Sequence, residues 1–454
     1  MNGKKVLVFG MARSGIAAAK LLRQQGAEVH ITDAKTEEKF EGALDELREG
    51  IIWHLGEAHP ENLLEGMDAF IISPGIPIDH VAVKRAQELG VEVLGEVELA
   101  YRASSGLLLA VTGTNGKTTT CTLLGEIFKN AGRRTFVVGN IGNPYTSIAA
   151  ELKSTDVTVC EISSFQMESA SQFHPAVSAV LNISEDHLNR HGTMENYIAL
   201  KERIFMNSIG ADSVVLNYDD PVVRGMAERV KSNVVWFSRT QDVPYGAFVR
   251  EGMIVFGTPE EYRSVCECGE IYIPGDHNLE NALAASAMAL VAGVPAPVVR
   301  HTLRSFQGVE HRIEFVREVS GVHFINDSKG TNVDSSIRAV RAMTRPTVLI
   351  AGGYDKHTDF TPLCEEIVKC SIDRVVLIGD TAKQLAETLD KCGFSRWEMA
   401  GYDFEKAVSR AYELAEAGGS VLLSPSCASF DMFSDYEARG RIFKDLANAL
   451  PEKA

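Results

Sequence analysis

The segment Ala110–Thr119 (A-V-T-G-T-N-G-K-T-T) constrains the fold of this 454-residue chain more than any other. The apolar run Leu107–Val111 enters it, and a helix-like segment, Thr118–Asn130, leaves it. A strand, a glycine turn and a helix in this order aim backbone N–H groups at one point, where a phosphate can lie at the positive end of the helix. Lys117 can reach the terminal phosphates of a nucleotide, and the Thr118 hydroxyl can hold Mg²⁺. The segment therefore predicts ATP binding.

This phosphate-loop pattern is shortened. The strict pattern requires a glycine five places before Gly116, and Val111 stands there. The alternative is an ordinary helix cap with Thr118 as a first-turn residue. The strand before the turn and the helix after it favour phosphate binding over that alternative.

Composition places the chain among globular proteins of more than one domain. Hydrophobic residues make up 45% and charged residues 23% of the chain, and its length predicts two or three domains. The net charge of −16, without a long basic run, argues against nucleic acid or an anionic membrane as the main partner. No apolar run approaches the roughly 20 residues of a membrane helix, and no signal-peptide pattern precedes the first strand. We expect a cytoplasmic protein that does not insert into a membrane.

The eight cysteines are scattered along the chain. Cys266 and Cys268 form a C-x-C pair, but no second pair lies at zinc spacing. We therefore interpret the cysteines as reduced thiols that serve mostly as small core residues.

Residues 1–95 form the first predicted domain. A strand, Lys5–Phe9, leads into the turn Gly10–Gly15, and a second strand ends at Asp33. This pattern resembles a dinucleotide-binding turn with an acidic residue after the second strand. Ala12 replaces the middle glycine, which normally lets a pyrophosphate approach the backbone. A helix–strand packing turn without a ligand therefore remains the alternative.

Two further domains follow. Residues 96–308 hold the phosphate loop and include a glycine-punctuated segment, Val234–Ile273, which predicts a small β-rich insertion. Residues 309–454 again alternate buried strands with amphipathic helices. The whole chain predicts an α/β protein of three domains, each built on a mainly parallel sheet. The first and third are expected to be Rossmann-like, and the central one is expected to be a phosphate-loop ATPase domain.

Polar residues follow buried strands at positions where parallel sheets bind ligands. Ser73-Pro74-Gly75 follows the strand Ala69–Ile72 of the first domain, and Glu161 and His187 follow strands of the central domain. The carboxyl ends of parallel strands meet at one edge. Glu161, His187 and Thr118 could therefore meet Mg²⁺ beside the phosphates of ATP. Taken singly, Glu161 is a solvated strand end and His187 a surface histidine.

Cationic candidates outside the phosphate loop lie in the third domain. Arg312, Lys329 and Lys356 occur in glycine- or turn-rich loops, where functional sites concentrate. The alternative for each is a solvated surface charge. We expect the third domain to supply cations and to close over ATP, which would exclude water from the site.

Taken together in their order, the motifs resemble those of the Mur ligase superfamily over essentially the full length of the chain. These motifs are T-G-T-N-G-K-T-T, E-I-S-S-F-Q, E-D-H-L-N-R-H, Y-I-A-L-K-E-R-I-F, G-D-H-N-L-E-N-A-L-A-A, H-R-I-E, N-D-S-K-G-T-N and S-P-S-C-A-S-F-D-M-F. The last two, with Tyr436–Gly440, resemble the branch of the superfamily that adds D-glutamate.

The resemblance implies an ATP-dependent amide ligase of bacterial peptidoglycan precursor synthesis, with links to cell-wall growth, cell shape and cell division. ATP would phosphorylate the terminal carboxylate of UDP-N-acetylmuramoyl-L-alanine. The amine of D-glutamate would then attack the acyl phosphate and release phosphate. No macromolecular partner is implied, and a monomer is expected.

The resemblance also implies roles for individual residues. Gly113, Thr114, Asn115, Gly116, Lys117, Thr118 and Thr119 would cradle ATP. Thr118 and Glu161 would hold one Mg²⁺, and His187 a second, with Lys201 carried as a carbamate that supplies the metal site with a carboxylate. The implied catalytic set is Lys117, Glu161, His187, Lys201 and Arg312. Positions near adenine, ribose or the γ-phosphate are Asn278, Asn281, Arg312 and Asp327. Positions near the UDP-sugar are Ser14, Asp33, Ser73, Gly75 and Asn140. Positions of the D-glutamate pocket are Lys329, Thr331, Lys356, Ser429 and Tyr436.

Two departures from the family pattern and three alternatives remain. Ala12 stands where relatives often have glycine, and Tyr436 adds a hydroxyl where an aromatic such as Phe can occur. The alternatives are another superfamily ligase with a different amino acid or a folate substrate, a nicotinamide dehydrogenase based on the Gly10–Gly15 turn, and a non-catalytic nucleotide-binding regulator. Without the resemblance, Lys201 would be interpreted as a plain helix-surface lysine.

Overall fold

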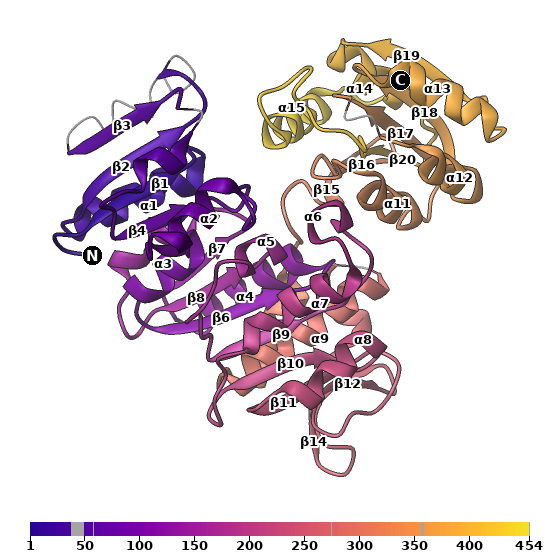
Figure 1. Cartoon of the computed structure of the whole chain (residues 1–454). Helices are drawn as coiled ribbons and strands as arrows, with labels where there is room; N and C mark the ends of the chain where they lie inside the picture. The colour runs from indigo at the N-terminus through magenta and orange to yellow at the C-terminus, as the bar shows by residue number, and fades with distance from the viewer. Residues whose placement is uncertain (38–49, 58, 274, 356–357, 454) are drawn as a thin grey trace. The chain divides into compact units, whose positions relative to one another are not determined.

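The computed structural model describes residues 1–37, 50–57, 59–273, 275–355 and 358–453. The chain divides into two compact units, Met1–Phe306 and Gln307–Ala454, whose helices and strands are labelled in Figure 1. Among the described residues, the first unit holds two sheets and the second unit holds one. Their strands are mostly parallel, which confirms the predicted α/β class with three mainly parallel sheets.

The first sheet has five parallel strands in the order β3-β2-β1-β4-β5. Its strands are β1 (Lys5–Phe9), β2 (Glu28–Asp33), β3 (Ile51–Leu55), β4 (Ala69–Ile72) and β5 (Glu92–Gly95). Helices α1 (Arg13–Gln24) and α3 (Glu96–Ala103) pack with one hydrophobic cluster of this sheet, and α2 (Val81–Glu88) packs with the other. Covered on both faces, β1 and β4 are apolar at nearly every position, as buried parallel strands are.

The second sheet has nine strands in the order β14-β13-β12-β11-β10-β9-β6-β8-β7. Its strands are β6 (Leu107–Thr112), β7 (Thr135–Gly139), β8 (Val157–Glu161), β9 (Val177–Val180), β10 (Ser213–Asn217), β11 (Asn233–Ser238), β12 (Gly246–Arg250), β13 (Met253–Gly257) and β14 (Tyr262–Glu267). Strands β6 to β12 pair in parallel, and β13 and β14 are antiparallel. The segment predicted as a β-rich insertion is indeed β-rich, and it continues the central sheet.

The helices of this sheet bring the candidate residues to its carboxyl edge. Helix α4 (Lys117–Asn130) packs against the alanine-rich α9 (Asp276–Val291), whose small side chains permit close approach. The other helices of the region are α5 (Ser164–Met167), α6 (Leu188–His191), α7 (Met194–Glu202), α8 (Pro221–Gly225) and α10 (Ala296–Ser305). Short 3₁₀ turns lie at Pro60–Leu63, Tyr145–Ser147, Ala149–Glu151, Arg203–Phe205, Met226–Arg229 and Cys268–Glu270.

The second unit is a three-layer α/β domain. Its sheet has the order β15-β16-β20-β17-β18-β19, and only β15 pairs antiparallel with its neighbour. The strands are β15 (Glu314–Val319), β16 (Val322–Asn326), β17 (Thr347–Gly352), β18 (Ile372–Ile378), β19 (Trp397–Gly401) and β20 (Ser420–Leu423). One face carries α11 (Val333–Arg341), α12 (Thr361–Lys369) and α13 (Ala382–Lys391), and the other carries α14 (Phe404–Leu414) and α15 (Tyr436–Ala449).

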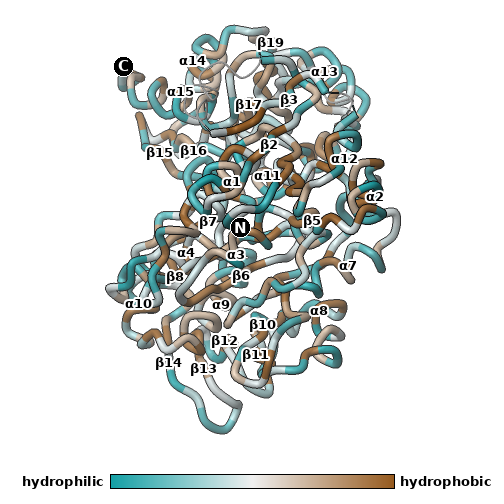
Figure 2. The backbone as a smooth tube through the Cα atoms, turned by 60° about the vertical axis from the view of Figure 1, so that its left-hand side comes forward, coloured by the Kyte–Doolittle hydropathy of each residue, from teal (hydrophilic) through white to brown (hydrophobic). Residues whose placement is uncertain are grey.

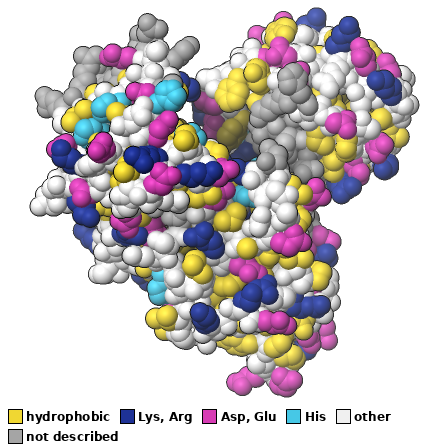
Figure 3. All heavy atoms as spheres, in the orientation of Figure 1, with side chains coloured by type: hydrophobic (Ala, Val, Ile, Leu, Met, Phe, Trp, Pro, Cys, Tyr) yellow, Lys and Arg dark blue, Asp and Glu magenta, His cyan; other side chains and the backbone are white. Residues whose placement is uncertain are grey.

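The distribution of hydrophobic and charged residues matches this layering. Figure 2 shows hydrophobic residues concentrated along sheet strands such as β17 and β6. Figure 3 shows acidic and basic side chains interspersed over the visible face. Of the helices that the structure describes, none combines the length and the apolar character that crossing a membrane requires.

Candidate active site

The predicted phosphate loop connects the end of β6 to the first residue of α4. Gly113 (φ 147°) and Gly116 (φ 82°) adopt backbone conformations that favour glycine, and Gly116 is the N-cap of α4. A Cβ on Gly116 would lie 2.3 Å from Oδ1 of Asn281, so the loop runs tightly against α9. The Lys117 ammonium folds over the loop and donates to the carbonyls of Gly113 (2.9 Å) and Thr114 (2.8 Å).

The segment after β9 supports the phosphate loop. The backbone N–H of Thr114 donates to the Asn182 carbonyl (2.9 Å), and that of Asn115 donates to the Asn182 side chain (2.8 Å). The Thr114 hydroxyl bonds to the Ser184 carbonyl (3.1 Å) and accepts the Ser184 N–H (3.0 Å). The loop is therefore held by residues that the sequence analysis did not single out, Asn182 above all.

Glu161 lies beside the loop, at the end of β8. Its carboxylate is 1% exposed and accepts a hydrogen bond at each oxygen. The Thr118 hydroxyl donates to Oε2 (3.0 Å), and the Asn140 amide donates to Oε1 (2.8 Å). Asn140, expected near the UDP-sugar, thus lies against the carboxylate expected to bind Mg²⁺. Thr118, Glu161 and Asn140 form one polar cluster, in which Thr118 and Glu161 are buried and Asn140 is exposed.

Lys201 approaches the same loop from α7. Its ammonium nitrogen donates to the Gly113 carbonyl (2.8 Å) and lies 4.6 Å from the centre of the Tyr197 ring. The residue is 2% exposed. Burial, followed by the neighbouring charge of Lys117, lowers the pKa of Lys201 well below its ordinary value. The Gly113 carbonyl therefore accepts hydrogen bonds from both lysines. Burial shifts the protonation equilibrium of Lys201 toward the neutral amine.

His187 lies at the N-terminus of α6 in a left-handed conformation (φ 54°). Its ring centre is 4.9 Å from that of Phe165, and its Nε2 is 3.5 Å from the Asp186 carboxylate. The side chain is 51% exposed. The structure thus places His187 at the exposed start of α6, in contact with Phe165.

The residues present fit a magnesium ion whose coordination shell is completed by the phosphates of a bound nucleotide. Among the described residues, no group of three or more His, Cys, Asp or Glu side chains is arranged to hold a metal. Mg²⁺ usually takes one or two protein oxygens and fills its remaining positions with phosphates and water. The Thr118 hydroxyl and the Glu161 carboxylate are oxygen donors of the required kind.

Asn278 and Asn281 lie in the first turns of α9, beside the loop. The Thr120 hydroxyl donates to Oδ1 of Asn281 (3.2 Å), and the Asn281 amide lies 3.4 Å from Oδ1 of Asn278. Asn281 therefore adjoins α4, and Asn278 contacts Asn281.

The candidate residues of the first sheet gather around the Gly10–Gly15 turn. The Asp33 carboxylate accepts the backbone N–H groups of Met11 (2.8 Å) and Lys35 (2.9 Å), which fixes the turn. A Cβ on Gly15 would lie 1.8 Å from the Gly10 carbonyl, so the first turn of α1, which holds Ser14, packs directly on the loop. The Ser73 N–H donates to the Phe9 carbonyl (3.2 Å), which places Ser73 and Gly75 at the same edge.

In the second unit, Asp327 is a buried carboxyl group at the end of β16. It accepts the Ser424 hydroxyl (2.7 Å) and the Ile313 N–H (3.3 Å). Burial raises its pKa to about 6, against the opposing effects of the Ser424 hydrogen bond and the Arg312 charge. Arg312 and Asp327, both expected near the nucleotide, are therefore neighbours.

The residues expected around D-glutamate fall on adjacent loops of the second unit. The Lys329 ammonium lies 5.7 Å from the centre of the Tyr436 ring, and the Thr331 N–H donates to the Lys329 carbonyl (2.9 Å). Ser429 is buried in the loop after β20. Lys356 lies outside the described residues.

The loops around Lys329 are held by a residue whose role the sequence analysis missed. Arg439 is buried, and its guanidinium donates to the Ser328 carbonyl (2.8 Å), the Ser328 hydroxyl (3.0 Å) and the Cys427 carbonyl (3.2 Å). Burial lowers its pKa to about 10. Arg439 occurs in the Tyr436–Gly440 motif, but residue type alone did not indicate that it joins two loops.

Family models match nearly the whole chain. They are "Mur ligase MurD-like, N-terminal domain" over residues 4–95, "Mur ligase middle domain" over residues 111–289 and "Mur ligase, glutamate ligase domain" over residues 311–427.

Similar proteins carry one name. The chain is 48% identical over 446 residues to a UDP-N-acetylmuramoylalanine–D-glutamate ligase of Caldanaerobacter subterraneus, with 98% of each chain covered. It is 44% identical over 453 residues to the protein of that name from Clostridioides difficile, with 99% of each covered.

Solved structures share the fold at low identity. A Thermotoga maritima UDP-N-acetylmuramate-alanine ligase matches with a TM-score of 0.61 and 18% identity, covering 98% of this chain and 99% of that chain. A MurF ligase of the same organism, in complex with ADP, matches with a TM-score of 0.59 and 19% identity, covering 93% and 96%.

Proposed function

The chain belongs to the Mur ligase family, and from this membership we propose that it is an ATP-dependent ligase that joins D-glutamate to UDP-N-acetylmuramoyl-L-alanine. The reaction belongs to peptidoglycan precursor synthesis. We expect it to run in the cytoplasm, where ATP is supplied, on a monomeric enzyme.

The observation that carries the proposal is the convergence of Lys117, Lys201 and the Thr118–Glu161 pair on one glycine turn. Lys117 and Lys201 both donate to Gly113, and Thr118 bonds to Glu161 within the same region. Phosphoryl transfer depends on positioning and on neutralising charge rather than on covalent help from the protein. These groups are suited to both tasks.

The chemistry follows from the weakness of a carboxylate as an acyl donor. The terminal carboxylate of the acceptor attacks the γ-phosphorus of ATP, which forms a C(O)–O–P bond and releases ADP. The neutral amine of D-glutamate then attacks the acyl carbon, phosphate leaves with the C–O bond electrons, and the amine loses a proton. Lys117 and Arg312 are proposed to stabilise the charge of the transferring phosphoryl group. Holding the amine at attack distance supplies much of the remaining acceleration.

Mg²⁺, when bound, neutralises phosphate charge. Thr118 and Glu161 would hold one ion, and His187 and Lys201 a second. Lys201 can contribute only after its neutral amine adds CO₂ to form a carbamate and releases a proton. The lowered pKa and the burial of Lys201 support this modification, because the neutral amine is the nucleophile for CO₂.

We propose a division of labour among three domains. Residues 1–95 bind the UDP-sugar, 96–308 bind ATP and 309–454 bind the amino acid. The acceptor set is Ser14, Asp33, Ser73, Gly75 and Asn140. The nucleotide set is Gly113–Thr119 with Asn278, Asn281, Arg312 and Asp327. The D-glutamate set is Lys329, Thr331, Lys356, Ser429 and Tyr436, whose cationic and hydroxyl groups suit an acidic ligand.

An ADP-release assay over a panel of UDP-muramoyl acceptors and amino acids tests this function. We expect release only when UDP-N-acetylmuramoyl-L-alanine and D-glutamate are both present, with no substitution by L-glutamate. Release that depends on a different amino acid would contradict the proposal and favour another ligase of the family.

A further inference from the structure

The Arg190 side chain joins the two sheets of the first unit. Its guanidinium makes a two-fold hydrogen bond to the Glu168 carboxylate, Nε to Oε1 (3.1 Å) and Nη2 to Oε2 (2.6 Å). It also donates to three successive carbonyls of the loop after β4, those of Pro74 (3.4 Å), Gly75 (3.1 Å) and Ile76 (3.1 Å). Arg190 thus connects the central sheet to a loop of the first sheet.

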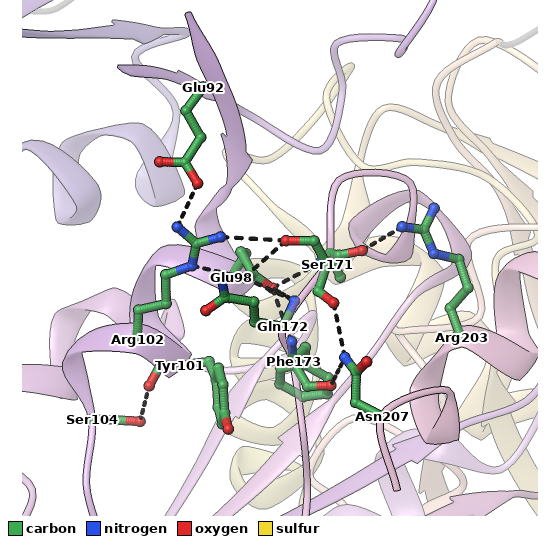
Figure 4. A network of polar contacts seen from close by, with 11 residues as sticks. Glu92, Glu98, Tyr101, Arg102, Ser104, Ser171, Gln172, Phe173, Arg203 and Asn207 are labelled. Atoms are coloured by element: carbon green, nitrogen blue, oxygen red, sulfur yellow. Dashed lines mark hydrogen bonds and ion pairs between the residues drawn. The ribbon is translucent and has the colours of Figure 1, made fainter. Parts of the chain in front are cut away.

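Glu168 is a rigid anchor for Arg190, because other side chains form hydrogen bonds with the backbone N–H and carbonyl groups of the 168–173 segment. Figure 4 shows Glu98, Arg203 and Asn207 around residues 171–173 of this segment. The buried Glu98 carboxylate of α3 accepts the N–H groups of residues 171, 172 and 173, each at 3.0 Å. Arg203 donates to the carbonyls of residues 168 (3.2 Å) and 170, and Asn207 to those of 171 (2.9 Å) and 173 (3.1 Å).

Arg190 also lies close to His187. It belongs to α6, three residues after His187, and its guanidinium lies 4.7 Å from the centre of the Phe165 ring. The same ring contacts His187 (4.9 Å between ring centres). One short helix therefore presents His187 and, through Arg190, holds the Pro74–Ile76 loop.

The geometry points to Arg190 as a positioning residue for the acceptor. We propose that Arg190, oriented by Glu168, holds the Pro74–Ile76 loop at a fixed distance from His187. At this distance the UDP-sugar acceptor can bind with its carboxylate directed toward the nucleotide. The inference rests on the proposed function, since Gly75 is assigned there to the acceptor. Only arginine presents enough donors in a plane to serve a carboxylate and several carbonyls together.

Steady-state kinetics of Arg190→Lys, Arg190→Ala and Glu168→Gln test this role. We expect Arg190→Ala to raise the acceptor KM about tenfold or more, since a mostly buried charge pair is broken. The KM values for ATP and D-glutamate should stay within about twofold. Arg190→Lys should not restore the acceptor KM, because an ammonium cannot reproduce the planar contacts. Arg85→Ala is the matched control, since Arg85 forms an exposed pair with Glu88 on α2 of the same unit (3.1 Å).

Calorimetric binding of UDP-N-acetylmuramoyl-L-alanine without ATP provides a second readout. We expect weaker binding to Arg190→Lys at a temperature well below the melting temperature of the variant, where a loss of stability alone would leave binding unchanged. In a double-variant cycle, Glu168→Gln should add little once Arg190 is Ala, because the carboxylate acts through the guanidinium.

If the wild type turns over this acceptor and both Arg190 variants keep its KM and its binding, the role of Arg190 is overturned and the proposed function stands. A parallel rise of all three KM values would also overturn the role of Arg190, since that would indicate general loosening. A wild type inactive with this acceptor would overturn the proposed function first and this inference with it.

Discussion

The hydroxyl of Thr118 donates a 3.0 Å hydrogen bond to Oε2 of Glu161, although 43 residues separate the two. Parallel pairing brings them together, because Glu161 lies opposite Val111 on the neighbouring strand β6, just before the loop that leads to Thr118. The Asn140 amide fixes the second carboxylate oxygen (2.8 Å). The pair is therefore preorganised at the edge where the phosphate loop begins.

Glu161→Gln should lower kcat by about 100-fold or more, the usual cost of removing a preorganised electrostatic contact in a catalytic site. Glutamine has the same shape, its amide oxygen can accept from Asn140 and its amide nitrogen can donate to the Thr118 hydroxyl, so the melting temperature should change little. ADP release over a Mg²⁺ titration measures the effect, and the loss should persist at saturating Mg²⁺. Turnover within tenfold of the wild type would remove Glu161 from the proposed metal site.

Lys117→Ala should lower ligase turnover by more than about tenfold, which corresponds to roughly 1.4 kcal/mol of barrier. The Thr114 carbonyl would lose the Lys117 hydrogen bond, the Gly113 carbonyl would retain that of Lys201, and the phosphates would lose a neutralising charge. ADP release with all substrates saturating measures the change. A variant that retains its turnover would show that Lys117 has no catalytic role.

Lys201 should carry a carbamate. Incubation with ¹³C-bicarbonate should produce a carbamate carbon signal in wild type that Lys201→Ala lacks. Lys201→Ala should lose turnover, and bicarbonate should not restore it, because no amine remains to be modified. A small carboxylate such as acetate should restore part of the activity. An unmodified Lys201 in a metal-loaded crystal of active enzyme would contradict the carbamate.

Asp327 should make the second unit less stable as pH rises from about 4 to about 7. Its folded-state pKa of about 6 lies above the ordinary value for an aspartate. As pH rises, the unfolded chain therefore loses this proton at a lower pH than the folded chain does. The free energy of unfolding falls by up to about 3 kcal/mol across that window. The Asp327→Asn variant has no carboxyl group at this position, so it lacks this contribution to the pH dependence of stability.

Denaturant unfolding at pH 4.5 and pH 7.5 compares Asp327→Asn with the wild type. The stability of the variant relative to the wild type should be more favourable at the higher pH, and the comparison cancels the other titrating groups. A difference independent of pH would show that Asp327 does not titrate as proposed.

Much of the fold could be predicted because local signals agree with the tertiary structure. Strands Lys5–Phe9 and Ala69–Ile72 have the bounds that their patterns predict. Each is a short apolar or amphipathic segment bounded by turn residues, so that burial and local preference favour the same structure. The Gly10–Gly15 turn was ambiguous by itself, and its domain is matched by the MurD-like N-terminal model.

The residues of the candidate site could be predicted where their side chains follow strands of the sheet. They could not be predicted where their side chains form hydrogen bonds with the backbone of loops. Glu161 and Thr118 could be placed together because parallel strands end at a common edge. Asn182 and Arg190 bind loop N–H groups and carbonyls, which carry no residue-type pattern. The buried position of Arg439 depends on two loops, one of them at Ser328, 111 residues away in sequence, and the other at Cys427.

We propose above all that the site around Gly113 uses ATP to activate the acceptor carboxylate. Transfer of ¹⁸O from the labelled carboxylate of UDP-N-acetylmuramoyl-L-alanine tests it most directly. We expect one ¹⁸O atom in each inorganic phosphate released, in step with formation of the D-glutamyl product. Phosphate without ¹⁸O, released during full product formation, would contradict it.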